Sequence, residues 1–364
     1  MQDPQSAVVA VIAEKISSGA ELGLQVAAYF NGELIVDAWG GLAEAGTDRA
    51  VAESTMFTMF SCSKGVTSTA LHTLAERGAL DYDDPIAKYW PEFGQFGKSA
   101  ITIRHVLTHM AGLPDVPIGI DVTDWDRMCW AITQLDPQFL PGTETAYSGL
   151  TFGWLIGEVV RRVDGRTLAE VLAQDVCAPA AIPDLYLGVP DSELDRIAVL
   201  QNGVSMIDGP YANYATRYFA PRFNERDVHQ ASIPAGGIIG TARSLARMYA
   251  ALIGDGVDGV RILPADRVAV ATTLQTEATD RTLGRPIRKA LGYVLGEPGS
   301  IMGTRPNAFG HTGHGGSIGF ADPDCGLSFA LAKNRLILDV QPGEGTAYEL
   351  VRAVRVALGI AESS

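Results

Sequence analysis

The stretch Met56–Arg77, MFTMFSCSKGVTSTALHTLAER, joins a short strand-like run to a helical pattern and places Ser61 and Lys64 at the junction. Apolar residues recur every fourth position after this junction, which predicts a helix from Cys62 to Arg77 that ends before Gly78. Side chains three positions apart lie on the same face of a helix. The Ser61 Oγ and the Lys64 Nζ are therefore expected within hydrogen-bonding distance.

Ser61 and Lys64 together have the residue types of an activated nucleophile. A serine hydroxyl is a poor nucleophile until an adjacent base or cation assists it. The start of a helix adds free N–H groups and a positive dipole end, which favour an alkoxide and can donate to an oxyanion. Serine is also a common N-cap, and lysine is common on solvated helix faces, so Ser-x-x-Lys alone is a weak motif. Its meaning depends on the rest of the chain.

Strand-like segments lie at both ends of the chain, and helical patterns fill the middle. Near the N-terminus, Leu22–Phe30 and Glu33–Trp39 flank Asn31-Gly32, which predicts a β-hairpin with a type I′ turn. Strands are also expected at Met56–Phe60, Ala290–Leu295, Ser317–Asp322 and Leu327–Lys333. Helices are also expected at 8–18, Thr102–Met110, Gly153–Val163, Leu168–Val176, Ala242–Leu252 and about 345–358.

This order excludes a doubly wound sheet, which needs regular alternation of strands and helices. We expect an α+β fold, with an antiparallel sheet built from both termini, flanking helices and an inserted, mostly helical lobe. The sheet domain is predicted to comprise residues 1–60 and 236–364, and the helical domain residues 61–235. The cleft between two such lobes is the natural place for a binding site.

Composition and charge limit the kinds of partner. The chain has 364 residues, of which 47% are hydrophobic, and its net charge of −14 argues against nucleic acid and anionic membrane surfaces. No apolar run is long enough to span a membrane, and the short run Ala7–Ala13 lacks the basic start of a signal peptide, so a cytoplasmic location is expected. The four cysteines are widely spaced, which argues against a disulfide framework or a zinc ribbon. The oligomeric state is left open.

Two further segments give Ser61 and Lys64 a chemical context. Tyr147-Ser148-Gly149 precedes a helix, and a tyrosine near a lysine ammonium can have its phenol pKa lowered enough to transfer protons. His311-Thr312-Gly313 enters a strand-like stretch, where glycine lets a backbone N–H approach a substrate oxygen. Each segment alone is also compatible with ordinary packing.

In order and separation, Ser61-Cys62-Ser63-Lys64, Tyr147-Ser148-Gly149 and His311-Thr312-Gly313 resemble the three motifs of the serine β-lactamase and penicillin-binding superfamily. The similarity extends from about residue 10 to 335. The closer match is to the class C-like branch, which has a Y-x-N second motif. That branch includes D-alanyl-D-alanine carboxypeptidases and the family VIII carboxylesterases, to which the chain is most similar.

This resemblance implies roles for individual residues. Ser61 is expected to form the acyl-enzyme, while Lys64 and Tyr147 share the proton transfers; which of them takes the first proton is left open. The backbone N–H groups of Ser61 and His314 are expected to form the oxyanion hole, and His311-Thr312-Gly313 to bind substrate. No metal or cofactor is implied.

Two departures from the family motifs shift the expected substrate. Gly149 replaces the asparagine of Y-x-N, and His311 replaces the lysine of K-T-G and is expected to be only partly charged near neutral pH. Both changes weaken the binding of a β-lactam or peptide carboxylate, so hydrolysis of a small-molecule carboxylic ester is favoured. The alternatives are a β-lactamase, a D-amino-acid peptidase or amidase, an acyltransferase, or a non-catalytic binding protein. The segment Gly203–Asn224 is expected to line the acyl pocket.

Three other patterns point to different chemistry and are rejected. Residues 315–319 match G-x-S-x-G, but no histidine follows His314, as an α/β-hydrolase triad requires. Residues 254–259 match G-x-G-x-x-G, but they follow a helix and contain two aspartates that repel a pyrophosphate. His105 and His109 have a zinc-like spacing on a predicted helix but lack an identifiable third ligand, so packing or capping is favoured.

Overall fold

A computed structural model describes residues 3–203, 220–337 and 343–360. Its main feature is a six-stranded antiparallel sheet with the strand order β2-β1-β10-β9-β8-β7. The strands are β1 (Gly23–Phe30), β2 (Glu33–Gly41), β7 (Val294–Leu295), β8 (Phe309–Thr312), β9 (Ile318–Asp322) and β10 (Leu327–Lys333). Because β1 pairs directly with β10, the expected antiparallel sheet built from both ends of the chain is confirmed.

The hairpin between β1 and β2 has the turn that its sequence predicts. Asn31 and Gly32 have φ angles of 50° and 83°, and a type I′ turn requires a positive φ at both central positions. The pairing register shifts between Ala28 and Tyr29, where the strands contain an irregularity. The turn therefore fixes the pairing of β1 with β2 locally, whereas the pairing of β1 with β10 joins segments that are distant in the sequence.

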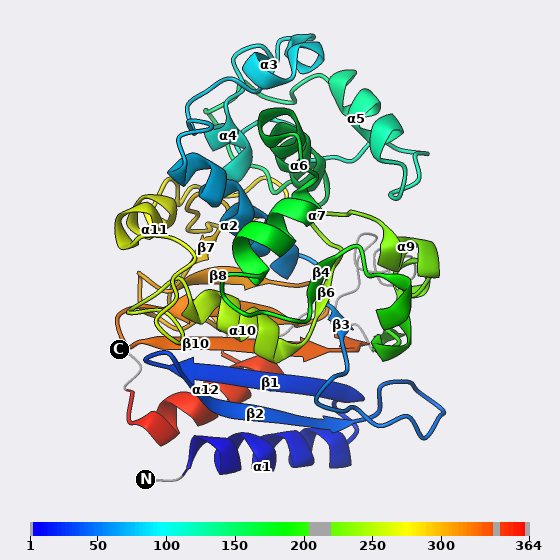
Figure 1. Ribbon diagram of the computed structural model, residues 1–364, viewed down its shortest axis with the longest axis vertical. Coiled ribbons are helices and arrows are strands. Elements are labelled where there is room, and N and C mark those ends of the chain that lie inside the picture. The colour runs from blue at the N-terminus through cyan, green and yellow to red at the C-terminus, as the bar shows by residue number, and fades with distance from the viewer. Residues whose placement is uncertain (1–2, 204–219, 338–342, 361–364) are drawn as a thin grey trace.

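Helices cover both faces of the sheet. Helices α1 (Pro4–Ser17) and α12 (Thr346–Leu358) pack side by side against one face, where Val8, Leu350 and Val354 are buried (Figure 1). Helix α10 (Ala242–Ala250) crosses the other face and contacts β1, β9 and β10. The apolar surface of each face is thereby removed from water.

The remaining helices gather at one end of the molecule, above the sheet in Figure 1. They are α2 (Cys62–Glu76), α3 (Ile86–Tyr89), η1 (Pro91–Gly94), α4 (Ile103–Leu107), α5 (Trp125–Thr133), α6 (Thr151–Asp164), α7 (Leu168–Val171) and η2 (Leu172–Cys177). The elements outside the main sheet also include η3 (Asp191–Arg196), α9 (Arg226–Gln230), α11 (Ala265–Thr272) and the short strands β3 (Phe57–Thr58), β4 (Leu185–Leu187), β5 (Gln201–Asn202), β6 (Ile238–Gly240) and β11 (Arg335–Leu336). The predicted domain limits at residues 61 and 236 stay a prediction.

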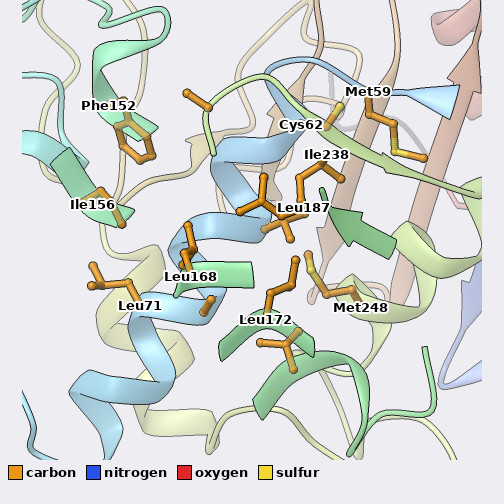
Figure 2. Close-up of a cluster of buried hydrophobic side chains, with 14 of the residues drawn as sticks. Met59, Cys62, Leu71, Phe152, Ile156, Leu168, Leu172, Leu187, Ile238 and Met248 are labelled. Atoms are coloured by element: carbon orange, nitrogen blue, oxygen red, sulfur yellow. The ribbon is translucent and has the colours of Figure 1, made fainter. Parts of the chain in front are cut away.

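Helix α2 runs through the centre of the core (Figure 2). The four-residue apolar period predicts a single buried face, yet every residue from Cys62 to Ala75 is buried. Polar side chains on its other faces form hydrogen bonds within the helix or with neighbouring segments of the chain. Thr67, for example, donates to the Pro234 carbonyl over 2.7 Å. Side chains near the start of α2 are therefore held rigidly and away from bulk water.

Two predicted elements differ from their expected form in the structure. The strand expected at Ala290–Leu295 is reduced to β7, because Gly292 has a φ of 82° and donates its N–H to the Leu107 carbonyl. The helix expected at Leu168–Val176 begins as α7 and continues as the π-helical segment η2.

Within the described ranges, no helix combines the length and apolar character that crossing a membrane requires.

Candidate active site

Ser61 lies at the junction of β3 and α2, where the chain turns sharply. The preceding residue, Phe60, has a φ of 46°, which is a strained conformation for a non-glycine residue and is typical of functional sites. Ser61 occupies the N-cap position of α2, but its side chain makes no capping hydrogen bond. The half-buried Ser61 Oγ lies 3.1 Å from the Lys64 Nζ instead, so the capping interpretation is wrong.

Lys64 is fully buried and forms no ion pair with any carboxylate of the described chain. Its Nζ donates to the carbonyl oxygens of Gly149, over 2.7 Å, and Ala235, over 3.1 Å. Burial lowers the pKa of Lys64 to about 7, because the charged ammonium is poorly solvated there. A substantial fraction of Lys64 is consequently a neutral amine near neutral pH.

The neutral form of Lys64 has a defined orientation. A neutral amine has two N–H donors and one lone pair, and the carbonyls of Gly149 and Ala235 accept the two donors. The lone pair is left for the third neighbour, the Ser61 hydroxyl. In this state Ser61 donates to Lys64, which is the arrangement needed for removal of the serine proton.

The second motif lies over Lys64. The Lys64 Nζ is 4.7 Å from the centre of the Tyr147 ring, and that ring packs against the imidazole of His311 with 6.0 Å between ring centres. Gly149 has open space around its α-carbon, so no steric constraint demands glycine there. Its contribution to the site is the backbone carbonyl that binds Lys64.

His311 is a buried residue of β8, and its hydrogen bonding fixes its tautomer. Its Nδ1 lies 2.7 Å from the Thr312 carbonyl oxygen, which can only accept, so Nδ1 carries the hydrogen. The Nε2 is then a bare acceptor, buried and without a hydrogen-bond partner among the described residues. Burial, reinforced by the positive charge of Lys64, lowers the pKa of His311 to about 3. The expectation of a partly charged His311 near neutral pH is therefore corrected: the imidazole is neutral.

The third motif continues into a tight turn beside Ser61. The Gly313 N–H donates to the Ser317 carbonyl over 2.7 Å, and a Cβ at Gly313 would lie 2.2 Å from the Met59 carbonyl oxygen. Only glycine fits this close approach. The His314 ring consequently packs 5.5 Å from the Phe60 ring, next to Ser61, while the Thr312 side chain is exposed. The oxyanion-hole role of the Ser61 and His314 N–H groups stays a prediction.

The rejected patterns have ordinary structural explanations. Ser317 is buried between a turn and β9 and is not followed by a helix. Residues 254–259 form the loop after α10. His105 caps α4, whereas His109 lies beyond the end of α4. The expectation that both histidines lie on one helix is therefore wrong. No group of three His, Cys, Asp or Glu side chains suited to a metal ion occurs in the described part of the chain.

Cys62, which follows Ser61 directly, carries a second potentially nucleophilic group beside the site. Cys62 is buried and donates to the His311 carbonyl, and burial raises the pKa of its thiol to about 12, so it is not a competing nucleophile. Most of the segment expected to line the acyl pocket, Gly203–Asn224, lies outside the described residues.

The fold and this buried serine–lysine pair define a class of serine acyl-transfer hydrolases, and comparisons with known proteins agree. The Beta-lactamase family model matches residues 8–352, so the chain belongs to the beta-lactamase family. It is 34% identical to the esterase/beta-lactamase LipL of Mycobacterium tuberculosis, over 92% of this chain and 82% of LipL. Among solved structures, a family VIII carboxylesterase (TM-score 0.89) and a penicillin-binding protein homolog from Caulobacter crescentus (TM-score 0.88) are each 33% identical, with 98% of both chains covered in each case.

Proposed function

We propose that the protein is a serine carboxylesterase that hydrolyses neutral carboxylic esters through an acyl-enzyme on Ser61. The observation that carries the proposal is the buried Lys64, whose Nζ lies 3.1 Å from the Ser61 Oγ and is held there by the carbonyl oxygens of Gly149 and Ala235. The names of the relatives support it, since one is an esterase/beta-lactamase and another a family VIII carboxylesterase.

The proposed reaction proceeds by double displacement. Lys64 accepts the proton of the Ser61 hydroxyl, and the Ser61 Oγ forms a bond to the ester carbonyl carbon. The N–H groups of Ser61 and His314 stabilise the oxyanion. The proton returns, through Lys64 and Tyr147, to the departing alkoxide, which leaves as an alcohol. A water molecule then gives a proton to the same base and attacks the acyl carbon, which releases the acid and restores Ser61.

The state of His311 favours neutral substrates. A bare imidazole nitrogen repels a carboxylate, whereas it can accept a hydrogen bond from a hydroxyl group. The Lys289 ammonium is not available as a substitute, because it is paired with Asp280. β-Lactams and D-alanyl peptides carry a carboxylate, so they are expected to be poor substrates.

A substrate panel tests this proposal. We expect kcat/KM for p-nitrophenyl acetate or butyrate to exceed that for a chromogenic cephalosporin by about 10²-fold, because the cephalosporin carboxylate is left unpaired. A D-alanyl-D-alanine peptide should be equally poor. Faster turnover of the cephalosporin than of either ester contradicts the proposal and supports the β-lactamase alternative. Addition of an alcohol, followed by product analysis, separates hydrolysis from acyl transfer.

The pH dependence of ester hydrolysis should reveal Lys64. Its active form is the neutral amine, so kcat/KM is expected to fall about tenfold per unit as the pH drops below about 7, and to level off above it. His311 should add no step near neutral pH, because its pKa is about 3. Initial rates from about pH 5 to about pH 9 check this. A profile that rises only towards the ordinary lysine pKa contradicts it.

A further inference from the structure

We infer that His109 and Asp280, which is paired with the buried Lys289, are positioning residues. They hold Tyr147 over Lys64 by accepting three successive backbone N–H groups, those of residues 146–148. This inference rests on the role proposed for Tyr147 in ester hydrolysis. It concerns residues outside the three motifs.

The three hydrogen bonds have ordinary lengths and come from one stretch of chain. The Ala146 N–H donates to the His109 carbonyl over 2.9 Å, and the Ser148 N–H donates to the His109 Nδ1 over 3.0 Å. Between them, the Tyr147 N–H donates to the Asp280 Oδ1 over 3.1 Å. Residues 146–148 belong to neither a helix nor a strand, so these acceptors replace the usual backbone partners.

His109 is held in an unusual conformation to make its two contacts. Its φ is 59°, which is uncommon for a residue other than glycine, although histidine adopts it more often than most residues do, and its side chain is buried. Burial keeps the pKa of His109 well below its usual value, so the imidazole is neutral and Nδ1 can accept the Ser148 N–H. The ring also packs against Tyr147, with 4.7 Å between ring centres. One residue therefore supports both the backbone and the ring of Tyr147.

The Asp280–Lys289 pair supports the segment from the other side. Asp280 is fully buried and Lys289 nearly so, and the Lys289 Nζ lies 2.5 Å from the Asp280 Oδ2. Lys289 also donates to the Thr145 Oγ1 over 2.6 Å, so the cation contacts the chain two residues before Tyr147. A buried carboxylate is tolerated only when it is paired and hydrogen-bonded. The other carboxylate oxygen, Oδ1, accepts the Tyr147 N–H together with the N–H groups of Thr282 and Leu283.

This arrangement bears on the reaction because small displacements are costly. A misplacement of about 1 Å can lower a rate by about 10²-fold when reacting groups must be aligned. Tyr147 projects from an irregular segment, so without these acceptors its ring has no regular backbone structure to hold it in place. His109, Asp280 and Lys289 are expected to act through Tyr147 and not on the substrate.

The first experiment compares His109→Ala with His105→Ala. Both histidines accept a backbone N–H through Nδ1, but His105 supports the start of α4, through the Thr102 N–H at 3.2 Å, and not Tyr147. We expect H109A to lower kcat for p-nitrophenyl butyrate by about 10-fold to 10²-fold with KM little changed, and H105A by less than about threefold. His109→Asn should recover most of the rate, because asparagine tolerates a positive φ and offers an acceptor oxygen.

A double-mutant cycle with Tyr147→Phe separates positioning from general structural damage. If His109 acts through the Tyr147 hydroxyl, H109A should cost less than about twofold in the Y147F background. The same fold loss in both backgrounds overturns the inference. Full activity of Y147F would instead contradict the role proposed for Tyr147, so the two failures can be distinguished.

Variants of the ion pair provide an independent test of the inference, which can still be carried out if H109A does not fold. D280N/K289M removes both charges but keeps an acceptor oxygen for the Tyr147 N–H, whereas D280A/K289M removes that acceptor. We expect kcat of the second variant to be about tenfold or more below that of the first, with this difference abolished by Y147F. Equal kcat values for the two folded variants, as judged by circular dichroism, contradict the inference.

Discussion

Replacement of Ser61 with alanine is expected to lower kcat for a short-chain p-nitrophenyl ester by about 10³-fold or more, because loss of the nucleophile removes the covalent route altogether. The fold should be preserved, since the Ser61 side chain does not cap α2. Steady-state rates of purified wild-type and variant protein measure this directly.

The chain supplies a matched control in Ser317, the serine of the G-x-S-x-G pattern. Ser317 is buried and lies between a turn and β9, and S317A should retain ester hydrolysis within about threefold of wild type. If S61A kept its rate while S317A lost it, the nucleophile would be misassigned.

Replacement of Lys64 with methionine should be nearly as damaging, with a loss of about 10³-fold in kcat. Methionine fills a similar volume but cannot accept the Ser61 proton, so the hydroxyl stays un-ionised. The residual activity should also lose the step near pH 7 that burial of Lys64 produces. Rates measured across neutral pH test both expectations.

Lys98→Met is the control for the loss of a buried lysine. Lys98 is also buried, and it donates to the Thr133 and Leu135 carbonyls near the end of α5. K98M should therefore lower the thermal unfolding temperature yet leave kcat within about threefold of wild type. Equal losses of kcat in K64M and K98M would mean that Lys64 acts through stability alone.

Local signals were strong enough to predict much of the fold from the sequence. Asn31-Gly32 favours a type I′ turn through its backbone conformation, and the strand-like runs on either side of it pair as the predicted hairpin. The limits of β10 agree with the predicted Leu327–Lys333, because that run is buried throughout and is followed by Asn334. The three motifs likewise predicted that Ser61, Lys64 and Tyr147 lie close together, and in the structure Lys64 contacts both of the others.

Features that depend on contacts between distant segments could not be predicted in this way. His109 was expected on a helix, but α4 ends at Leu107 and His109 itself has a positive φ. The spacing of apolar residues does not predict such a backbone conformation. Asp280 acts by accepting a backbone N–H, which any segment can offer, so it had no recognisable motif. The lowered pKa of Lys64 likewise depends on the complete enclosure of α2, whereas its sequence shows a single apolar face.

The most direct test of the central claim is to label the wild-type protein with a fluorophosphonate probe and to map the modified residue by mass spectrometry. The account predicts one adduct per chain, located on Ser61, with ester hydrolysis lost in proportion to labelling. An adduct on another residue, such as Ser317 or Cys62, or full ester hydrolysis by a protein that takes up no probe, would contradict it.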